Sequence, residues 1–283
     1  MQTPVTTGTW EINQIPLVNF KCLSTGFPYL DKILGHSEAR NEYGLPLGAI
    51  SIWSGSKGVG KTRTLSSISN LMCQMNTRLL YFQLEISPQQ FRTHLQKIVH
   101  APPNTFIISS YNTRNEMISA MQFIKPQLVI IDSINMMEGY GSAKECKIIF
   151  ERFRDITAQL NCNILCVAHL NKDGSTKGDS TVEHLGDMVC SLTKEVPPKR
   201  YKGEVPDLTG IFRLLVKKNR FGISDQSALF HHIDSGVEFL GCSLPEWLNK
   251  ARGNPMGYVS SVPRIKGFWQ KAYEFFGLTP KIG

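Results

Sequence analysis

The sequence lacks the patterns that mark secreted, zinc-binding and membrane-spanning proteins. Its seven cysteines include no pair with CxxC spacing, and an odd, irregularly spaced set predicts neither a disulfide framework nor a zinc site. No apolar run approaches the roughly 18 residues that a membrane span needs. The start of the chain has no basic region followed by an apolar stretch, so we expect no signal peptide and a cytoplasmic location.

Acidic residues are scarce relative to basic ones. The 283 residues include 31 Lys and Arg against 23 Asp and Glu, which gives a formal net charge of +8. This excess is compatible with an anionic partner and equally with simple solubility, so charge alone does not choose between them. No internal repeat or low-complexity tract divides the chain. Its length suits one large α/β domain with a short appendage, or two small domains.

Apolar, strand-like runs alternate with helix-like segments in the first two thirds of the chain. The run at residues 128–131 contains only aliphatic side chains, as a central parallel strand covered on both faces does. The alternation predicts an α/β fold with a mostly parallel central sheet and helices on both faces. The expected strands are 49–53, 79–84, 105–109, 128–131 and 163–168, and the expected helices are 61–75, 88–99, 114–124 and 143–160.

The pattern changes after about residue 186. Short apolar runs joined by turns predict an antiparallel extension of the sheet, with strands at 188–193, 211–216, 228–232 and 237–240. Residues 194–202 form a basic, proline-containing connection, which indicates a loop. From residue 245 onward the chain mixes Gly, Pro, basic and aromatic residues, and we expect a tail with one short helix near 267–276. That helix either packs on its own core or docks a partner protein.

The most specific motif is a glycine-rich turn that matches GxxxxGK[ST] in full, between a predicted strand and a predicted helix. Glycines let the backbone approach phosphate oxygens, and the amides at the helix start point at them. Lys61 is expected to bring positive charge to the β- and γ-phosphates, and the Thr62 hydroxyl to bind Mg²⁺. The sequence therefore predicts an ATP and Mg²⁺ site formed by Gly55, Ser56, Lys57, Gly58, Val59, Gly60, Lys61 and Thr62.

Three further polar residues stand at the ends of predicted strands. Asp132 follows four aliphatic residues, the pattern of a Walker B strand, and is expected to hold Mg²⁺ through water. Glu85 is either the base that deprotonates the attacking water or an acid at the start of the next helix, and position alone does not decide. His169 is either a contact to the γ-phosphate or a structural histidine.

Two basic segments are candidates for contacts with phosphates outside the chain's own nucleotide. Lys172 and Lys177 lie in a polar, glycine-containing loop and are candidate DNA-binding residues, although a solvated loop is the default interpretation. Lys218 and Arg220 follow the predicted strand at 211–216. These two cations either reach phosphates across a subunit interface or form a charged turn.

Together these motifs resemble the RecA-fold ATPase core of the bacterial RadA/Sms family. The resemblance rests on the STGFPYLD lead-in at residues 24–31, the strand end at 81–85, the Asp132-Ser133 pair and the KNRFG string at 218–222, which is specific to that family. Lys172-Asp173-Gly174, Glu183-His184 and Asp187 recur there as well. The similarity covers roughly residues 22–240.

The resemblance implies specific roles. In that family the core forms hexameric rings, hydrolyses ATP and moves on single-stranded DNA during recombination. By resemblance, Lys218 and Arg220 act on the neighbouring subunit's nucleotide, Glu85 is the catalytic base, and residues 172–183 face DNA. The sequence contains neither the family's four-cysteine zinc module nor its Lon-protease-like domain, and residues 36–43 are an extra segment. A phage-encoded version acting in a bacterial host cytoplasm is one interpretation.

The expected function is a DNA-dependent ATPase, of the helicase or branch-migration type, that translocates on or remodels single-stranded DNA in recombination, repair or replication. Two alternatives stay open: a RecA-like recombinase that forms ATP-dependent filaments, and a regulatory ATP-binding oligomer that ignores DNA. We expect a homo-oligomer, a hexameric ring, with no membrane partner, and a replication or recombination protein as a partner of the tail. The expected division is a lead-in at 1–21, the ATPase core at 22–244 and the tail at 245–283.

Overall fold

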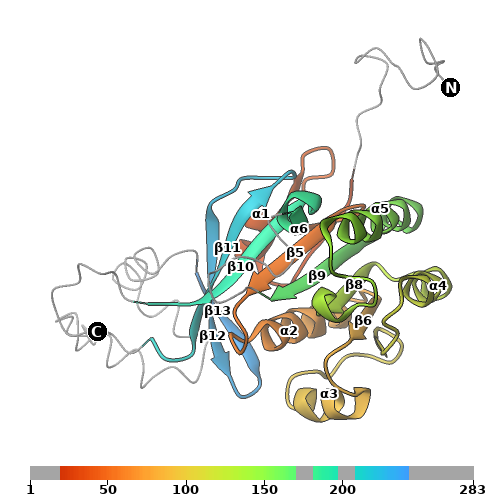
Figure 1. The fold of residues 1–283 in the computed structure, drawn as a ribbon. Helices are drawn as coiled ribbons and strands as arrows, with labels where there is room; N and C mark the ends of the chain where they lie inside the picture. The colour runs from red at the N-terminus through yellow and green to blue at the C-terminus, as the bar shows by residue number, and fades with distance from the viewer. Residues whose placement is uncertain (1–19, 170–180, 197–207, 242–283) are drawn as a thin grey trace, which may run out of the picture.

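The computed structural model of the chain describes residues 20–169, 181–196 and 208–241. In these residues, helices cover both faces of a nine-stranded sheet (Figure 1). The strand order is β13-β12-β11-β10-β5-β9-β8-β6-β7. The strands are β5 (Ile50–Gly55), β6 (Leu79–Gln83), β7 (Phe106–Ser109), β8 (Leu128–Asp132), β9 (Asn163–His169), β10 (Met188–Lys194), β11 (Ile211–Asn219), β12 (Gln226–Ile233) and β13 (Gly236–Gly241).

Several sequence predictions lie outside the described residues. They concern most of the 1–21 lead-in, Lys172 and Lys177 in the polar loop, most of the basic loop at 194–202, and the tail with its helix near 267–276. In the part of the chain that is described, no helix is both long and apolar enough to cross a membrane.

The parallel part of the sheet is confirmed, and it is one strand wider than predicted. Strands β10, β5, β9, β8, β6 and β7 pair in parallel with their neighbours. β10, predicted as the first antiparallel strand, is parallel to β5 and antiparallel to β11. The reason is its connection: the chain leaves β9, returns through the short helix α6 (Thr181–Leu185) and enters β10 in the direction of β5. Within the nine-stranded sheet, β10, β11, β12 and β13 pair antiparallel in succession.

The four long helices form where the sequence pattern predicts them, because each start has a local cause. α4 (Arg114–Ile124) and α5 (Ala143–Leu160) have the predicted bounds, and the hydroxyls of Thr113 and Ser142 accept hydrogen bonds from amides of their first turns. α2 (Lys61–Gln74) starts directly at the glycine turn. α3 (Pro88–Leu95) ends four residues earlier than predicted, and the chain continues in a turn in which the amides of Ile98 and Val99 both donate to the Leu95 carbonyl oxygen at 2.8 Å.

The sheet separates two hydrophobic cores. Alternate side chains of a strand point to opposite faces, so Tyr81 packs on the α2 and α3 side and Phe82 on the α4 and α5 side. Strands β5, β6 and β8 are buried along their whole length, as the aliphatic run at 128–131 indicates. The six cysteines in the described residues are free and buried, which agrees with the interpretation of Cys162 and Cys166 as core residues.

The N-terminal part of the core holds small elements that the sequence did not reveal. They are the strand pair β1 (Cys22–Leu23) and β4 (Leu45–Pro46), the helix α1 (Pro28–Leu34), and the hairpin of β2 (His36–Ser37) and β3 (Glu42–Tyr43). The hairpin is the extra segment at 36–43. Its His36 amide donates to the carbonyl oxygen of Phe221 at 3.0 Å, so this segment packs beside the KNRFG string.

The polar residues of the STGFPYLD lead-in have a structural role. The buried carboxylate of Asp31 accepts the Ser24 hydroxyl at 2.6 Å and the Thr25 amide at 2.7 Å. Burial raises the pKa of Asp31, whereas these hydrogen bonds favour its ionised form. These hydrogen bonds therefore stabilise the turn before α1. The polar side chains of the motif bond to one another and lie away from the glycine-rich turn.

Candidate nucleotide-binding site

The glycine-rich turn connects β5 to α2 at the carboxyl edge of the parallel strands, where ligands bind in open α/β sheets. Gly58 and Gly60 have φ angles of 76° and 89°, a left-handed region that side-chain-bearing residues rarely adopt. The register of β5 with β9 places Gly55 beside His169. The turn and the end of β9 therefore form one surface.

Lys61 lies inside the turn and is only 5% exposed. Its Nζ donates to the carbonyl oxygens of Gly55 at 2.7 Å and Ser56 at 3.0 Å, and lies 3.2 Å from His169 Nδ1. Burial lowers the pKa of Lys61, because water that would hydrate the ammonium is excluded. A buried cation beside the amides of a helix start is an arrangement that suits a phosphate anion.

Thr62 and Asp132 bring a hydroxyl and a carboxylate together beside the turn. Thr62 Oγ1 donates to Asp132 Oδ2 at 2.7 Å, and the Tyr81 hydroxyl donates to the same oxygen at 2.6 Å. Asp132 is 2% exposed, and burial raises its pKa. A buried carboxylate is stabilised in its ionised form by a nearby cation, and hard oxygen donors of this kind fit Mg²⁺. The residues present therefore fit the predicted metal.

Glu85 faces the turn from the end of β6. Its Oε1 lies 2.5 Å from His169 Nε2 and accepts the Ser133 hydroxyl at 2.8 Å. The hydrogen bond from His169, together with that from Ser133, lowers the pKa of Glu85 to about 2. Ser87 caps α3, in a capping box with Gln90. The helix therefore does not use Glu85 as its cap. Glu85 is thus an ionised acceptor at neutral pH.

His169 links Lys61 to Glu85. Because an ammonium can only donate, the contact with Lys61 makes Nδ1 the acceptor, and Nε2 then carries the proton that Glu85 accepts. The strand-end pattern of the sequence therefore brings Lys61, Thr62, Glu85, Asp132 and His169 to one place. Tyr81 and Ser133 join this cluster although neither was singled out as a site residue.

The KNRFG string lies at the opposite end of the sheet from the glycine turn. Lys218 Nζ donates to carbonyl oxygens at the end of α6, the shortest contact being 2.7 Å to Gly186. Arg220 pairs with Asp187 at 2.8 Å, and Asp187 accepts from the Ile50 amide at the start of β5. The five residue steps from there to the end of β5 span roughly 17 Å at the usual strand rise. Within one chain, Lys218 and Arg220 do not join the nucleotide cluster.

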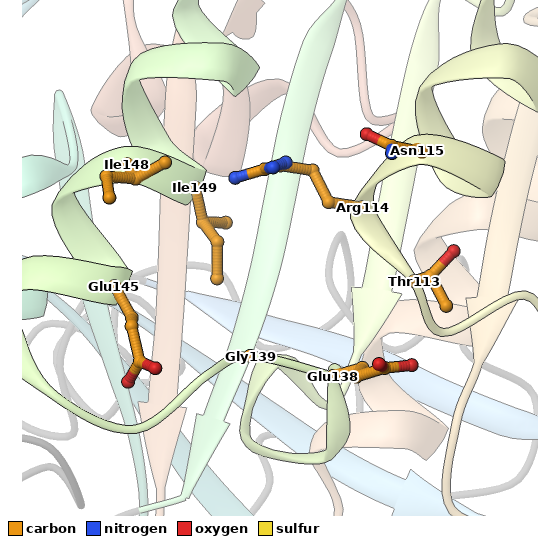
Figure 2. A pocket seen from close by; sticks show the side chains of 8 residues that line it. All are labelled: Thr113, Arg114, Asn115, Glu138, Gly139, Glu145, Ile148 and Ile149. Carbon is orange, nitrogen blue, oxygen red and sulfur yellow. The ribbon is translucent and has the colours of Figure 1, made fainter.

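A pocket of about 310 Å³ lies elsewhere, between the starts of α4 and α5 (Figure 2). Arg114 extends across it from α4, and Glu138 and Glu145 lie on its other side. Its charges are of both signs, and none of its lining residues belongs to the glycine turn or the Walker B strand. It is lined by Thr113, Arg114, Asn115, Glu138, Gly139, Glu145, Ile148 and Ile149. In the described residues, the groups suited to binding a triphosphate therefore lie at the glycine turn and not at this pocket.

Known proteins are similar to this chain in sequence and in fold. Residues 38–175 match the family described as AAA domain. The DNA repair protein RadA of Listeria monocytogenes is 25% identical over 232 residues, which are 80% of this chain and 47% of that protein. RadA of Mycobacterium tuberculosis is 27% identical over 222 residues, 76% of this chain and 42% of that protein. The chain thus spans about half the length of the curated relatives it matches.

A solved structure of an ATPase domain has the same fold, with a TM-score of 0.63 and 14% identity, and the match covers 80% of this chain and 93% of that one. The chain is a RadA-like ATPase core of the RecA fold. In this RadA-like core, the mostly parallel sheet, the helices on both faces and the antiparallel strands at the C-terminal end are as predicted.

The RadA-like core has one more residue at the turn that the sequence did not reveal. His232 on β12 lies half-buried against Gly60, with its ring stacked on Phe212 at a centroid distance of 3.9 Å. Burial, followed by repulsion from Arg63 and His231, lowers the pKa of His232 from 6.5 to about 4. The residues around His232 give no signal of this contact, because Gly60 lies far earlier in the chain, at the start of α2.

The lowered pKa of His232 predicts acid-sensitive stability. A folded-state pKa below the unfolded value means that His232 contributes full stability above pH 6.5 and loses it as the pH falls toward 4. After allowance for solvent screening, the wild type is expected to lose about 1 kcal/mol more unfolding free energy than His232→Gln between about pH 7.5 and 5. Urea unfolding at both pH values measures this, and parallel losses in the two proteins would contradict it.

Proposed function

We propose that this chain is a DNA-dependent ATPase that binds single-stranded DNA and uses ATP turnover to translocate on it or remodel it, in recombination, repair or replication. The observation that carries the proposal is the cluster of Lys61, Asp132, Glu85 and His169 at the glycine turn of a RadA-like core. The name of the curated relatives, DNA repair protein, supports DNA as the partner.

The proposed chemistry follows from the site's polar atoms. The amides of the turn and the Lys61 ammonium bind the phosphates, while Thr62 and Asp132 hold Mg²⁺. When bound, the metal neutralises charge on the phosphate oxygens. Glu85 accepts the proton of the attacking water, and it is suited to this because two hydrogen bonds keep its carboxylate ionised and oriented. His169 holds that carboxylate and stands between it and Lys61, where it can respond to loss of the γ-phosphate.

Assembly into a ring is part of the proposal. Lys218 and Arg220 lie near the amino end of β5, and the glycine turn lies at its carboxyl end. Head-to-tail packing of subunits brings opposite ends of neighbouring sheets together, and a closed rotation gives a ring. We therefore propose a hexamer in which Lys218 and Arg220 complete the neighbour's site. Electron microscopy of the ATP-bound protein should show closed rings; open helices would favour a recombinase-like filament instead.

The remaining partners are proposed from sequence alone. Lys172 and Lys177 are the proposed DNA-phosphate contacts, and the tail from residue 245 is the proposed docking segment for a replication or recombination protein in the cytoplasm. Neutralising phosphates with lysines releases counterions, so binding should weaken as salt rises. Substituting both lysines with alanine should lower DNA affinity and its salt dependence together.

Single-stranded DNA is expected to raise the ATPase rate about tenfold at about 50 mM salt, and less at about 300 mM salt. Phosphate release with and without oligo(dT) measures this for the full chain. Lys61→Ala should lack activity under every condition, which excludes a contaminating ATPase. A wild-type protein that hydrolyses ATP but neither binds oligo(dT) nor responds to it would refute the DNA partner and favour a regulatory oligomer that ignores DNA.

A further inference from the structure

The β12–β13 hairpin lies against α2 (Figure 1). Arg63 Nη2 donates to the carbonyl oxygen of Asp234 at 3.1 Å, and a Cβ added to Gly236 would lie 2.6 Å from the Ser67 hydroxyl. Gly236 has a φ of 134°, which also favours glycine. The hairpin and the first two turns of α2 are therefore in close contact.

His232 extends this contact to the phosphate-binding turn itself. A Cβ added to Gly60 would collide with His232 Cε1 and would lie 2.7 Å from Nδ1, so the ring rests directly on that glycine. On its other side the ring stacks on Phe212 of β11, with an interplanar angle of 23°. The His232 amide donates to Gly210 O at 2.8 Å and fixes the backbone that carries the ring. The imidazole is thus held between the sheet and the turn.

Hydrogen-bond donors and acceptors determine how the ring acts. The Thr64 hydroxyl donates its one proton to Gly60 O at 3.0 Å, so its oxygen must accept from His232 Nε2, which is 2.8 Å away. A chain of two hydrogen bonds therefore runs from His232 through Thr64 to the carbonyl of Gly60. Thr64 is fully buried, so water does not substitute for either bond.

The Gly60 carbonyl controls the direction of a phosphate-binding amide. This carbonyl and the Lys61 amide belong to one planar peptide group and point in opposite directions. Gly60 O accepts from the Thr64 amide at 2.9 Å and from its hydroxyl, on the helix side. The Lys61 N–H consequently points out of the start of α2, toward the place where the turn's amides meet an anion.

We propose that His232 is a positioning residue for the phosphate-binding turn, acting through the Thr64 hydroxyl on the Gly60–Lys61 peptide group. This inference rests on the proposed nucleotide site. His232 stabilises the turn in the orientation that binds phosphate, so its loss weakens nucleotide binding more than it slows the chemical step. The β12–β13 hairpin thereby becomes part of the nucleotide site without contacting the nucleotide.

The test compares five forms of the full chain with the wild type: His232→Ala, His232→Gln, Thr64→Val, the His232→Ala/Thr64→Val double variant, and His231→Ala as the matched control on the same strand. The readouts are the dissociation constant of a fluorescent ADP, and KM and kcat for ATP. His232→Ala should raise the ADP dissociation constant and KM about tenfold and change kcat by less than about threefold. His232→Gln keeps an N–H near the Nε2 position and should restore most of the affinity.

Thr64→Val removes the linking hydroxyl at nearly constant volume, so its effect should match that of His232→Ala, and the double variant should be no worse than either. Additive losses, or a fall in kcat at unchanged KM, would overturn the proposal, as would unchanged ADP binding by His232→Ala. If His232→Ala unfolds, Thr64→Val and His232→Gln decide the matter alone. A wild-type chain that binds no ADP would instead refute the nucleotide site, and with it both proposals.

Discussion

Glu85→Gln is expected to lower the rate of ATP hydrolysis by about 10²–10³-fold and to leave ATP affinity within about threefold. The amide has nearly the same shape as the carboxylate and can still meet His169, but it cannot take a proton from water. The pKa of about 2 keeps the wild-type carboxylate ionised throughout the neutral range, so the charge is what the substitution removes. Single-turnover hydrolysis and equilibrium binding of fluorescent ATP separate the two effects.

Glu145→Gln is the matched control for this prediction. Glu145 is an exposed carboxylate in the capping box of α5, and it lies outside the nucleotide cluster. Its substitution should leave turnover unchanged. A Glu85→Gln protein that retains turnover within about threefold would show that Glu85 only holds His169. A thermal melt of each variant is needed, since loss of the contact with His169 can also loosen the end of β6.

The parts of the fold that were predictable are those with local causes. The glycine turn follows from one continuous motif, and α4 and α5 begin where Thr113 and Ser142 supply caps. The strand-end positions of Glu85, Asp132 and His169 followed from parallel strands ending at one edge. Such features need no knowledge of which distant segments meet, and the bounds of these two helices matched the prediction.

The parts that were missed depend on long-range register. Tyr81 reaches Asp132 across 51 positions, and His232 reaches Thr64 across 168. Each residue sits in an apolar strand pattern that is complete without the contact, so nothing nearby signals it. The small elements before β5 were missed because two-residue strands have no periodicity to detect. β10 runs parallel to β5 because the chain enters it from α6, and the pattern of apolar residues in β10 does not show the direction of a strand.

The KNRFG string was found from sequence, and each of its two cations has a structural contact within the chain. Lys218 caps the end of α6 and Arg220 pairs with Asp187. More than half of the Arg220 side chain remains exposed, at 54%. A cation with one face in an ion pair and the other in solvent is available to a neighbouring subunit. Its role in that neighbour stays a prediction, and it needs an experiment that separates subunits.

Arg220→Ala is expected to lower ATP turnover by about 10³-fold, the lower end of what an arginine finger contributes. The informative step is mixing this variant with Lys61→Ala, which is inactive for a different reason. In rings mixed from equal amounts of the two variants, some interfaces combine the intact turn of an Arg220→Ala subunit with the intact Arg220 of a Lys61→Ala neighbour. Random mixing places this combination at about one interface in four, so about a quarter of wild-type turnover should return. Subunit exchange should be verified by fluorescence energy transfer.

The recovery distinguishes a neighbour's role from a structural one. If Arg220 matters only through its ion pair with Asp187, each Arg220→Ala subunit carries its own defect and mixing restores nothing. That surface pair is worth only about 0–1 kcal/mol, which a thermal melt can detect and which is too little to stop turnover. Lys217→Ala is the matched control, since Lys217 precedes the motif's cations on β11 and pairs loosely with Glu183 at 3.7 Å. Its turnover should stay at the wild-type level, because Lys217 is not one of the two cations proposed to reach the neighbour's nucleotide.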